Sequence, residues 1–261
     1  KSAGEVTFTF TDSATGCSNT TSTSIAVNPL PEVSTSSSVT CVNSTIAAMP
    51  STGGVWSSSD ISIATITDGG VITGRAAGEV TFTYTDSATG CSNTTTNSVT
   101  VNPLPVVNTT SSFTCVNSTI TAMPGTGGTW ISSDSSIATI TDGGVITGRT
   151  AGEVTFTYTD SATGCSNTTK GTITVHNLPI VDLSEIEVCV GENITATPST
   201  DGVWSSSNDQ IATVTNAGIV TGLSEGQTTL RYTNTATGCS NITPFAIIVH
   251  PLPVVSTSSS V

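Results

Sequence analysis

The feature that most constrains the fold of this chain is a sequence repeat with a period of 74 residues. Cysteines recur at this spacing in two series and tryptophans in a third: Cys17, Cys91, Cys165 and Cys239; Cys41, Cys115 and Cys189; Trp56, Trp130 and Trp204. A sequence that repeats itself at a fixed period folds as an array of similar units. The 261 residues are therefore expected to form a tandem array of small domains.

Pro-Leu-Pro elements and one Asn-Leu-Pro element recur with the same period and mark the boundaries of the repeats. They predict the C-terminal part of one repeat at 1–28, complete repeats at 29–102, 103–176 and 177–250, and the start of another repeat at 251–261. Because the first and last segments are partial repeats, we expect the chain to be a section of a longer array.

Within a repeat, apolar and polar residues alternate with period 2, which is typical of half-buried strands. One stretch places Val80, Phe82 and Tyr84 on one face and Thr81, Thr83 and Thr85 on the other. Glycine-rich turn signals separate such stretches, and no stretch has the 3.6-residue period of a helix. The pattern predicts an all-β fold in which each repeat is an antiparallel sandwich of about seven short strands. The three tryptophans fall on predicted core strands and are interpreted as core residues.

The seven cysteines predict disulfides once the repeat is considered. We expect one disulfide within each complete repeat, near one end of the sandwich: Cys41–Cys91, Cys115–Cys165 and Cys189–Cys239. Cys17 would then lack a partner because the chain is truncated. A competing arrangement, which pairs Cys17 with Cys41 and Cys91 with Cys115, crosses the Pro-Leu-Pro elements and remains open. Either arrangement indicates an oxidising, extracytoplasmic location.

The composition excludes two classes of partner. Five Lys and Arg against 18 Asp and Glu give a net charge of -13, so no basic surface is available for nucleic acid. No apolar run approaches the ~20 residues of a membrane span, so no membrane insertion is expected. Serine and threonine make up 92 of the 261 residues, which we interpret as the solvated faces of strands.

No arrangement of residues predicts catalysis. The two histidines, His176 and His250, stand at the junction position that is Asn28 or Asn102 in other repeats, and we interpret them as variation at the junction. Asp60, Asp134 and Asp209 follow the tryptophan segments, where capping of a turn explains them. A calcium site between domains is the alternative for these carboxylates. We expect no enzyme, no cofactor and no metal site.

Four motifs of the repeat resemble a known family: Gly54-Val55-Trp56-Ser57-Ser58-Ser59-Asp60, Ile63-Ala64-Thr65-Ile66, Gly70-Val71-Ile72-Thr73-Gly74 and Gly78-Glu79-Val80-Thr81-Phe82-Thr83-Tyr84. In combination they resemble the bacterial Ig-like domain, group 2, and the resemblance covers all three complete repeats. The Gly90-Cys91-Ser92-Asn93 and Pro-Leu-Pro elements are similar to those of very large cell-surface and gliding-motility adhesins of Bacteroidetes.

This resemblance implies a function. The chain would be an immunoglobulin-like stalk segment of a secreted cell-surface adhesin filament, exported by the type IX system and serving gliding motility or surface attachment. Its partners would be the neighbouring repeats and, at the cell surface, polysaccharide or other proteins. The alternative function is a carbohydrate- or protein-binding module that recognises a ligand directly.

The tripeptide Asp-Ser-Ala recurs in a predicted hairpin loop at Ser13, Ser87 and Ser161. It is similar to the O-glycosylation acceptor of exported Bacteroidetes proteins, so these serines are candidate glycosylation sites. The fourth repeat has Asn234-Thr235-Ala236 instead and departs from the acceptor pattern. A plain turn stabilised by the aspartate is the competing explanation for the tripeptide.

Overall fold

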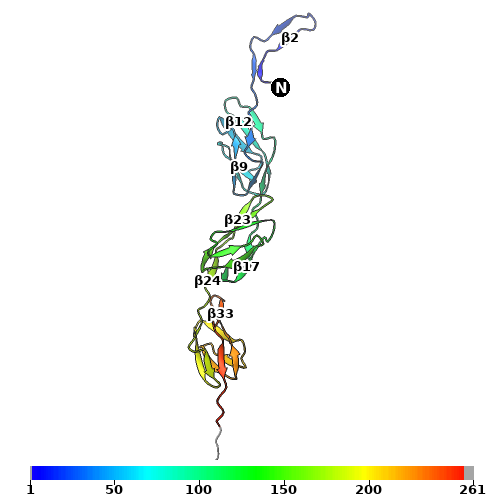
Figure 1. The fold of residues 1–261 in the computed structure, drawn as a ribbon. Helices are drawn as coiled ribbons and strands as arrows, with labels where there is room; N and C mark the ends of the chain where they lie inside the picture. The colour runs from blue at the N-terminus through cyan, green and yellow to red at the C-terminus, as the bar shows by residue number, and fades with distance from the viewer. Residues whose placement is uncertain (1, 256–261) are drawn as a thin grey trace, which may run out of the picture. The chain divides into compact units, whose positions relative to one another are not determined.

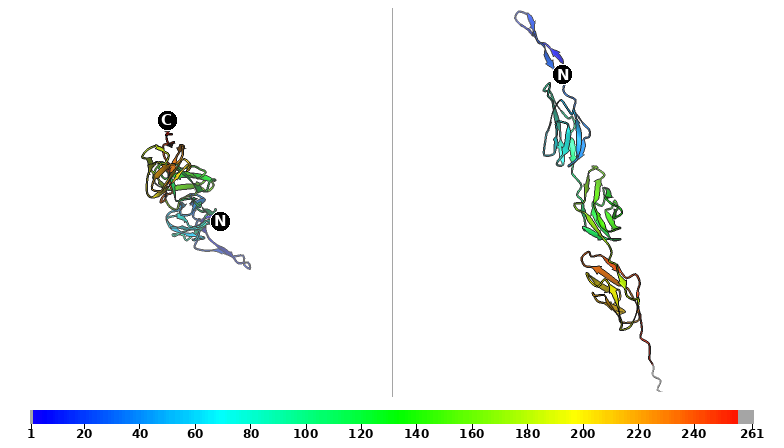
Figure 2. Two further views of the ribbon diagram at one scale, coloured as in Figure 1. Left: turned by 90° about the horizontal axis from the view of Figure 1, so that it is seen from below. Right: turned by 90° about the vertical axis from the view of Figure 1, so that its left-hand side faces the viewer.

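The computed structural model describes residues 2–255, and these residues form short β-strands joined by turns (Figures 1 and 2). Among them there is no helix long and apolar enough to cross a membrane. The last six residues of the predicted segment 251–261 lie outside the described part of the chain.

Repeat 29–102 contains ten strands: β5 (Ser34–Thr35), β6 (Val39–Cys41), β7 (Thr45–Met49), β8 (Gly54–Ser58), β9 (Ala64–Ile66), β10 (Val71–Gly74), β11 (Gly78–Val80), β12 (Phe82–Asp86), β13 (Ser92–Thr94) and β14 (Val99–Asn102). One layer is the four-stranded sheet β5-β7-β10-β9. The other consists of two three-stranded sheets, β13-β12-β8 and β11-β14-β6. The tandem sandwich architecture predicted from the alternation is confirmed.

The ten strands exceed the predicted seven because long extended stretches are divided between sheets. Residues 78–86 are nearly continuous, but β11 pairs with β14 whereas β12 pairs with β8 and β13. The change occurs at Thr81, which exchanges hydrogen bonds with Ser59 instead of a ladder partner. A second departure is the pairing of β6 with β14, which is parallel.

Each sandwich encloses one apolar core built from both layers. In repeat 29–102 the alternation places Phe82 and Tyr84 inside, with 0% and 1% of their surfaces exposed. Trp56 packs against Tyr84 with ring centroids 5.2 Å apart. On the opposite face of β12 the threonines bond across to β13, as in the 2.8 Å contact between the hydroxyls of Thr83 and Thr94. Threonine suits this face because its side chain is both β-branched and polar.

The other two complete repeats have the same order of strands. Repeat 103–176 contains β15 (Asn108–Thr109), β16 (Phe113–Cys115), β17 (Thr119–Met123), β18 (Gly128–Ser132), β19 (Ala138–Ile140), β20 (Val145–Gly148), β21 (Gly152–Val154), β22 (Phe156–Asp160), β23 (Ser166–Thr168) and β24 (Ile173–His176). Repeat 177–250 contains β25 (Asp182–Leu183), β26 (Glu187–Cys189), β27 (Asn193–Thr197), β28 (Gly202–Ser206), β29 (Ala212–Val214), β30 (Ile219–Gly222), β31 (Gly226–Thr228), β32 (Leu230–Asn234), β33 (Ser240–Ile242) and β34 (Ile247–His250).

The segment before the first complete repeat forms two isolated strand pairs, in which β1 (Gly4–Val6) pairs with β4 (Ile25–Val27) and β2 (Thr9–Thr11) with β3 (Ser18–Thr20). It has no counterpart of the four-stranded layer. Phe10 is therefore 76% exposed, although Tyr84 at the same repeat position is buried.

The density of contacts divides the chain into two compact units that do not follow the repeat boundaries. One unit extends to Pro105 and also includes Thr159–Asn167. The other consists of Val106–Tyr158 and the chain from Thr168 onward. The hairpin of repeat 103–176 thus groups with the repeat before it.

Candidate functional site: a disulfide across the repeat junction

Cys41 lies at the end of its repeat from which the chain leaves. It is the last residue of β6, and the parallel register of β6 with β14 places it opposite Asn102, directly before the Pro103 junction. The next amide, that of Val42, donates a 3.0 Å hydrogen bond to the Asn102 carbonyl. The ladder therefore holds Cys41 beside the first residue of the junction.

Close backbone contact with a glycine also fixes the position of Cys41. A Cβ added at Gly74, the last residue of β10, would lie 2.5 Å from the Cys41 carbonyl oxygen. At Gly148, the equivalent position in the next repeat, it would lie 2.5 Å from the Cys115 carbonyl oxygen. Only glycine lets the end of this strand pack so closely on the backbone of the cysteine.

Cys165 lies at the opposite end of its repeat, where the chain enters. It closes the tight turn between β22 and β23, in which the Asp160 amide donates a 2.9 Å hydrogen bond to the Cys165 carbonyl. The Asp160 carboxylate accepts hydrogen bonds from the Ala162 and Thr163 amides, at 3.0 and 2.8 Å. The Asn167 side chain donates a 2.9 Å hydrogen bond to the Pro105 carbonyl, so the hairpin is attached to the junction peptide.

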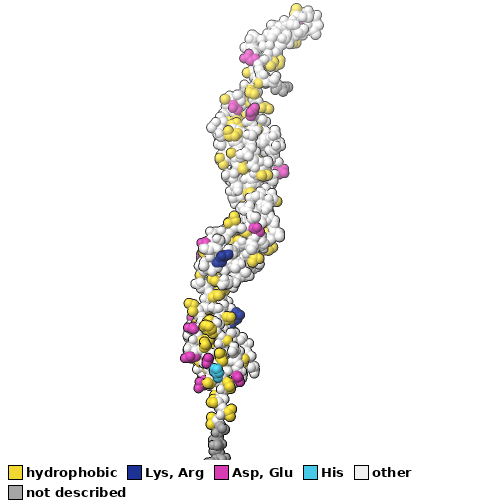
Figure 3. All heavy atoms as spheres, in the orientation of Figure 1, with side chains coloured by type: hydrophobic (Ala, Val, Ile, Leu, Met, Phe, Trp, Pro, Cys, Tyr) yellow, Lys and Arg dark blue, Asp and Glu magenta, His cyan; other side chains and the backbone are white. Residues whose placement is uncertain are grey.

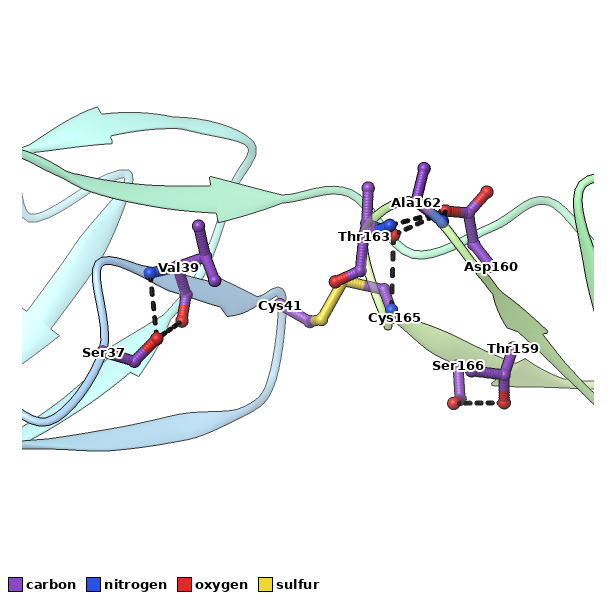
Figure 4. The surroundings of a disulfide bond; sticks show 9 residues. All are labelled: Ser37, Val39, Cys41, Thr159, Asp160, Ala162, Thr163, Cys165 and Ser166. Atoms are coloured by element: carbon purple, nitrogen blue, oxygen red, sulfur yellow. Dashed lines mark hydrogen bonds between the residues drawn. A yellow bond between two sulfur atoms is a disulfide. The ribbon is translucent and has the colours of Figure 1, made fainter.

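A disulfide joins Cys41 to Cys165, with 5.7 Å between the two Cα atoms (Figure 4). The bond links the exit end of repeat 29–102 to the hairpin at the entrance of repeat 103–176. Cys165 is completely buried there. Pro103, Leu104 and Pro105 line a small hollow together with Asp160 and Thr163 of the hairpin.

The next junction repeats this arrangement. A disulfide joins Cys115, at the end of β16, to Cys239 in the hairpin of repeat 177–250, again with 5.7 Å between the Cα atoms. Cys115 lies opposite His176 in a parallel ladder, and the Asn241 side chain donates a 3.0 Å hydrogen bond to the Pro179 carbonyl. Both disulfides join residues 124 positions apart.

The predicted disulfides within repeats are wrong. Cys41, Cys115, Cys165 and Cys239 are all oxidised as expected, but each partner lies in an adjacent repeat. The physical reason is that the two cysteines of one repeat lie at opposite ends of the sandwich. In repeat 29–102, Cys41 lies beside Asn102, whereas the hairpin of Cys91 is attached to Pro31 by a 2.8 Å hydrogen bond from Asn93. The competing predicted pairs, Cys17–Cys41 and Cys91–Cys115, are not formed either.

Three cysteines of the described chain are thiols. Cys17 is one of them, as expected, and it is exposed, whereas Cys91 and Cys189 are partly exposed and were expected to be paired. Cys91 occupies the same turn as Cys165: its amide donates to the Thr89 hydroxyl at 3.3 Å, as that of Cys165 does to Thr163. Cys189 ends β26 opposite His250, as Cys41 ends β6 opposite Asn102.

Hydrogen bonding to the hairpin aspartates makes them more acidic than usual. The Thr163 amide, the Thr163 hydroxyl and the Ala162 amide all donate to Asp160, and they lower the pKa of its carboxyl. The same contacts from Thr89 and Ala88 lower the pKa of Asp86. In repeat 177–250 the residue is Asn234, whose side-chain oxygen accepts the equivalent bonds from Ala236 and Thr237 at 3.0 Å.

We therefore expect the hairpin of repeat 103–176 to weaken in acid. Because the folded pKa of Asp160 lies below its unfolded value, the carboxylate adds stability at neutral pH, and this contribution is lost as the pH falls through the folded pKa. The NMR shift of the Thr163 amide proton should titrate with a midpoint below the ordinary aspartate pKa. The Thr237 amide, bonded to Asn234, provides the control and should not move. A Thr163 midpoint at or above the ordinary aspartate value would contradict the account.

The remaining candidate residues lie apart from the junction disulfides. Trp56, Trp130 and Trp204 are buried in the three cores, 4–7% exposed, and each indole donates a hydrogen bond to the backbone of a nearby proline. The serines of the Asp-Ser-Ala tripeptides are exposed on hairpin turns: Ser13, Ser87 and Ser161. The equivalent Thr235 differs, since its hydroxyl donates a 3.0 Å hydrogen bond to the Asp201 carbonyl.

The histidines and the aspartates after the tryptophans have local contacts. His250 lies 3.1 Å from the Glu187 carboxylate in a solvent-exposed pair, and the ring of His176 lies 5.9 Å from that of Phe113. Asp60 and Asp134 accept hydrogen bonds from the backbone and hydroxyl of the serine two residues on, which is the expected turn contact. In the equivalent turn of repeat 177–250 the acceptor is Asn208 rather than the predicted Asp209.

Within residues 2–255 no three side chains of His, Cys, Asp or Glu are grouped so that they could hold a metal ion. The face shown in Figure 3 consists mostly of neutral polar side chains and backbone, with scattered acidic residues and few basic ones. Acidic side chains are most frequent on that face over the sandwich of repeat 177–250, at the lower end of the view.

A sequence model of the bacterial Ig-like domain (group 2) matches residues 188–240. No curated protein matches the chain. Among solved structures, the chain is similar to invasin, a bacterial integrin-binding protein, at 13% identity and a TM-score of 0.34. The match covers 96% of this chain and 65% of the invasin chain. The chain is also similar to a SusE-like surface-located polysaccharide-binding protein of Bacteroides thetaiotaomicron, at 14% identity and a TM-score of 0.31. That match covers 94% of this chain and 51% of the other.

The chain also resembles a surface layer protein, SbsC, at 16% identity and a TM-score of 0.25, and spans 45% of that structure. These structural similarities are too low to transfer a function. Together, the sequence match and the two-layered fold support a bacterial Ig-like domain at residues 188–240, within a tandem array of Ig-like sandwiches.

Proposed function

We propose that this chain is the structural stalk of an extracellular, surface-attached protein, in which Ig-like repeats bounded at 29, 103 and 177 act as spacers. The observation that supports this best is the pair of disulfides across repeat junctions. The peptide chain already connects the repeats, and a disulfide across each junction limits how far adjacent repeats can separate under tension. Cys165 and Cys239 are buried, whereas their partners Cys41 and Cys115 are partly exposed.

The disulfides also support an extracellular location. Disulfides persist in oxidising compartments and are rare in the cytosol. The bacterial Ig-like match and the acidic, hydroxyl-rich composition fit a protein exposed outside the cell. We propose the cell surface as its site, with adhesion as its role. We propose more specifically that the protein is exported by the type IX system and serves gliding motility. This part of the proposal rests on the resemblance of the repeats to Bacteroidetes adhesins.

Direct ligand recognition is the weaker candidate. The three tryptophans, which would offer the largest surfaces for stacking a carbohydrate, are buried in the cores, and the exposed rings are phenylalanines such as Phe8 and Phe10. An enzyme is weaker still, because catalysis needs positioned acids, bases or nucleophiles. The acid–hydroxyl pairs among the described residues, such as the turn contact of Asp134 with Ser136, are exposed, and the contact of His250 with Glu187 is exposed as well.

O-glycosylation of Ser13, Ser87 and Ser161 is a further part of the proposal. All three serines are exposed on hairpin turns, where a modifying enzyme can reach their hydroxyls. Thr235 provides the internal comparison because its hydroxyl is hydrogen-bonded. Glycopeptide spectra of the native protein should show sugar on the three serines and none on Thr235. Bare serines in those spectra would remove this part of the proposal.

The surface location is tested on intact cells of the source organism. Antibody against the repeats should label unpermeabilised cells, and protease added outside should remove the label. Blocking of adhesion by monovalent antibody fragments would support the adhesin role. Label that appears only after permeabilisation would overturn the proposal of a surface stalk.

A further inference from the structure

The two disulfides change the covalent path along which a pulling force travels. The chain from Cys41 to Cys165 is a closed loop, because a single bond joins its two ends. When the chain is pulled at residues 28 and 177, on either side of repeats 29–102 and 103–176, the force reaches Cys41, passes through the disulfide and continues from Cys165. Tension of this kind cannot stretch the segment 42–164, whether it is folded or not.

We infer that repeats 29–102 and 103–176 form a tether whose length is set by the junctions and the Cys41–Cys165 disulfide, while both sandwich cores lie off the path of force. For a pull across repeats 29–102 and 103–176, the path contains residues 28–41, one disulfide and residues 165–177. The tryptophans, tyrosines and phenylalanines of both cores lie between Cys41 and Cys165, outside this path. The inference deepens the proposed stalk function, but its physical basis is the disulfide connectivity alone.

The second disulfide encloses the middle repeat again. The segment 116–238 is closed by Cys115–Cys239, so residues 116–164 lie inside both closed segments. A pull applied beyond Cys239 loads residues 116–164, because they form the shortest covalent route between the two disulfides. For a pull between positions 28 and 177, the path in that repeat contains only β23 and β24, which follow Cys165. β24 lies beside β16 in a parallel ladder, from Phe113 opposite Thr174 to Cys115 opposite His176.

The limit on length is large enough to measure. At about 3.4 Å per residue, the path between positions 28 and 177 extends to ~90 Å with the Cys41–Cys165 bond and to ~500 Å without it. Disulfides within each repeat would leave about 50 residues on the path and give ~180 Å. Because these are lengths of the fully stretched chain, they do not depend on the stability of any repeat.

The experiment is a single-molecule pull on the 261-residue chain, attached through azide-bearing residues at positions 28 and 177. Asn28 and Asn177 are exposed and lie in the junctions, so the attachments leave the sandwiches intact. We expect the oxidised chain to reach a contour length of ~90 Å, and the reduced chain and the Cys165→Ser variant to reach ~500 Å. The readout holds even if Cys165→Ser fails to fold, because an unfolded chain still reports its full length.

Two variants serve as matched controls. Cys91→Ser removes the equivalent cysteine of the neighbouring repeat, and Cys115→Ser removes the other disulfide; both should leave the ~90 Å limit unchanged. An oxidised length of ~180 Å, sensitive to Cys91→Ser, would overturn the inference in favour of disulfides within repeats. An oxidised length of ~500 Å would overturn it outright. Neither outcome bears on surface location, which the antibody experiment tests separately.

Discussion

Cys165→Ser will destabilise the array, whereas Cys91→Ser will leave its stability unchanged. Cys165 closes a disulfide between residues 124 positions apart, and in the chain-entropy model a loop of that size is worth about 5 kcal/mol. The loss of stability should appear mainly when repeats 29–102 and 103–176 unfold together. The disulfide restricts the unfolded chain most when both of the repeats that it joins are unfolded. Urea unfolding followed by tryptophan fluorescence measures it.

The comparison between these two variants is closely matched. Residues 62–95 and 136–169 are identical at 33 of 34 positions, so Cys91 and Cys165 lie in nearly the same hairpin. Serine should therefore disturb the turn itself equally at both sites, and the difference reports the disulfide together with the burial of Cys165 at the junction. Equal destabilisation by the two substitutions would mean that Cys91 is bonded as well, which contradicts the pairing described here.

Trp130→Ala will have the other large effect, a loss of about 3–5 kcal/mol in the stability of repeat 103–176. The indole is 5% exposed and packs against Tyr158 with ring centroids 5.1 Å apart. It also donates a 2.8 Å hydrogen bond to the Pro124 carbonyl. Alanine removes the ring, the aromatic contact and the hydrogen bond, and leaves a cavity between the two layers.

The neighbouring Ile131 is the control for this core substitution. It is on the same strand but points outward, 65% exposed, so Ile131→Ala should change stability by about 0.5 kcal/mol or less. Differential scanning calorimetry compares both variants with the parent chain. A small effect of Trp130→Ala would contradict the assignment of this tryptophan to the core.

The sandwich could be predicted from the sequence because the buried and exposed faces of a strand require apolar and polar residues to alternate. The alternation at Val80, Phe82 and Tyr84 reports which face is inside, and the structure buries all three. The repeat itself predicted that the domains follow one another along the chain. Strand boundaries were harder to predict, because the change of sheet at Thr81 depends on hydrogen bonds with Ser59, which is distant in sequence.

The disulfide pairing could not be predicted in the same way, because a periodic sequence leaves the register of the partner open. The sequence distance from a cysteine of the Cys41 series to one of the Cys91 series differs only by a multiple of 74 residues, whichever cysteine of the second series is chosen. The sequence around each candidate partner is therefore nearly the same. The deciding fact is which end of the sandwich each cysteine occupies. That follows from the parallel pairing of β6 with β14, a three-residue contact that leaves no periodic signal in the sequence.

The central claim, covalent linkage between adjacent repeats, is tested most directly by a tryptic map under non-reducing conditions. The five Lys and Arg residues of the chain, Lys1, Arg75, Arg149, Lys170 and Arg231, divide the cysteines among five peptides. With free thiols blocked first, the account predicts that peptide 2–75 is joined to 150–170, that 76–149 is joined to 232–261, and that 171–231 is alone. A map in which 76–149 joins both 2–75 and 150–170, and 171–231 joins 232–261, would contradict it.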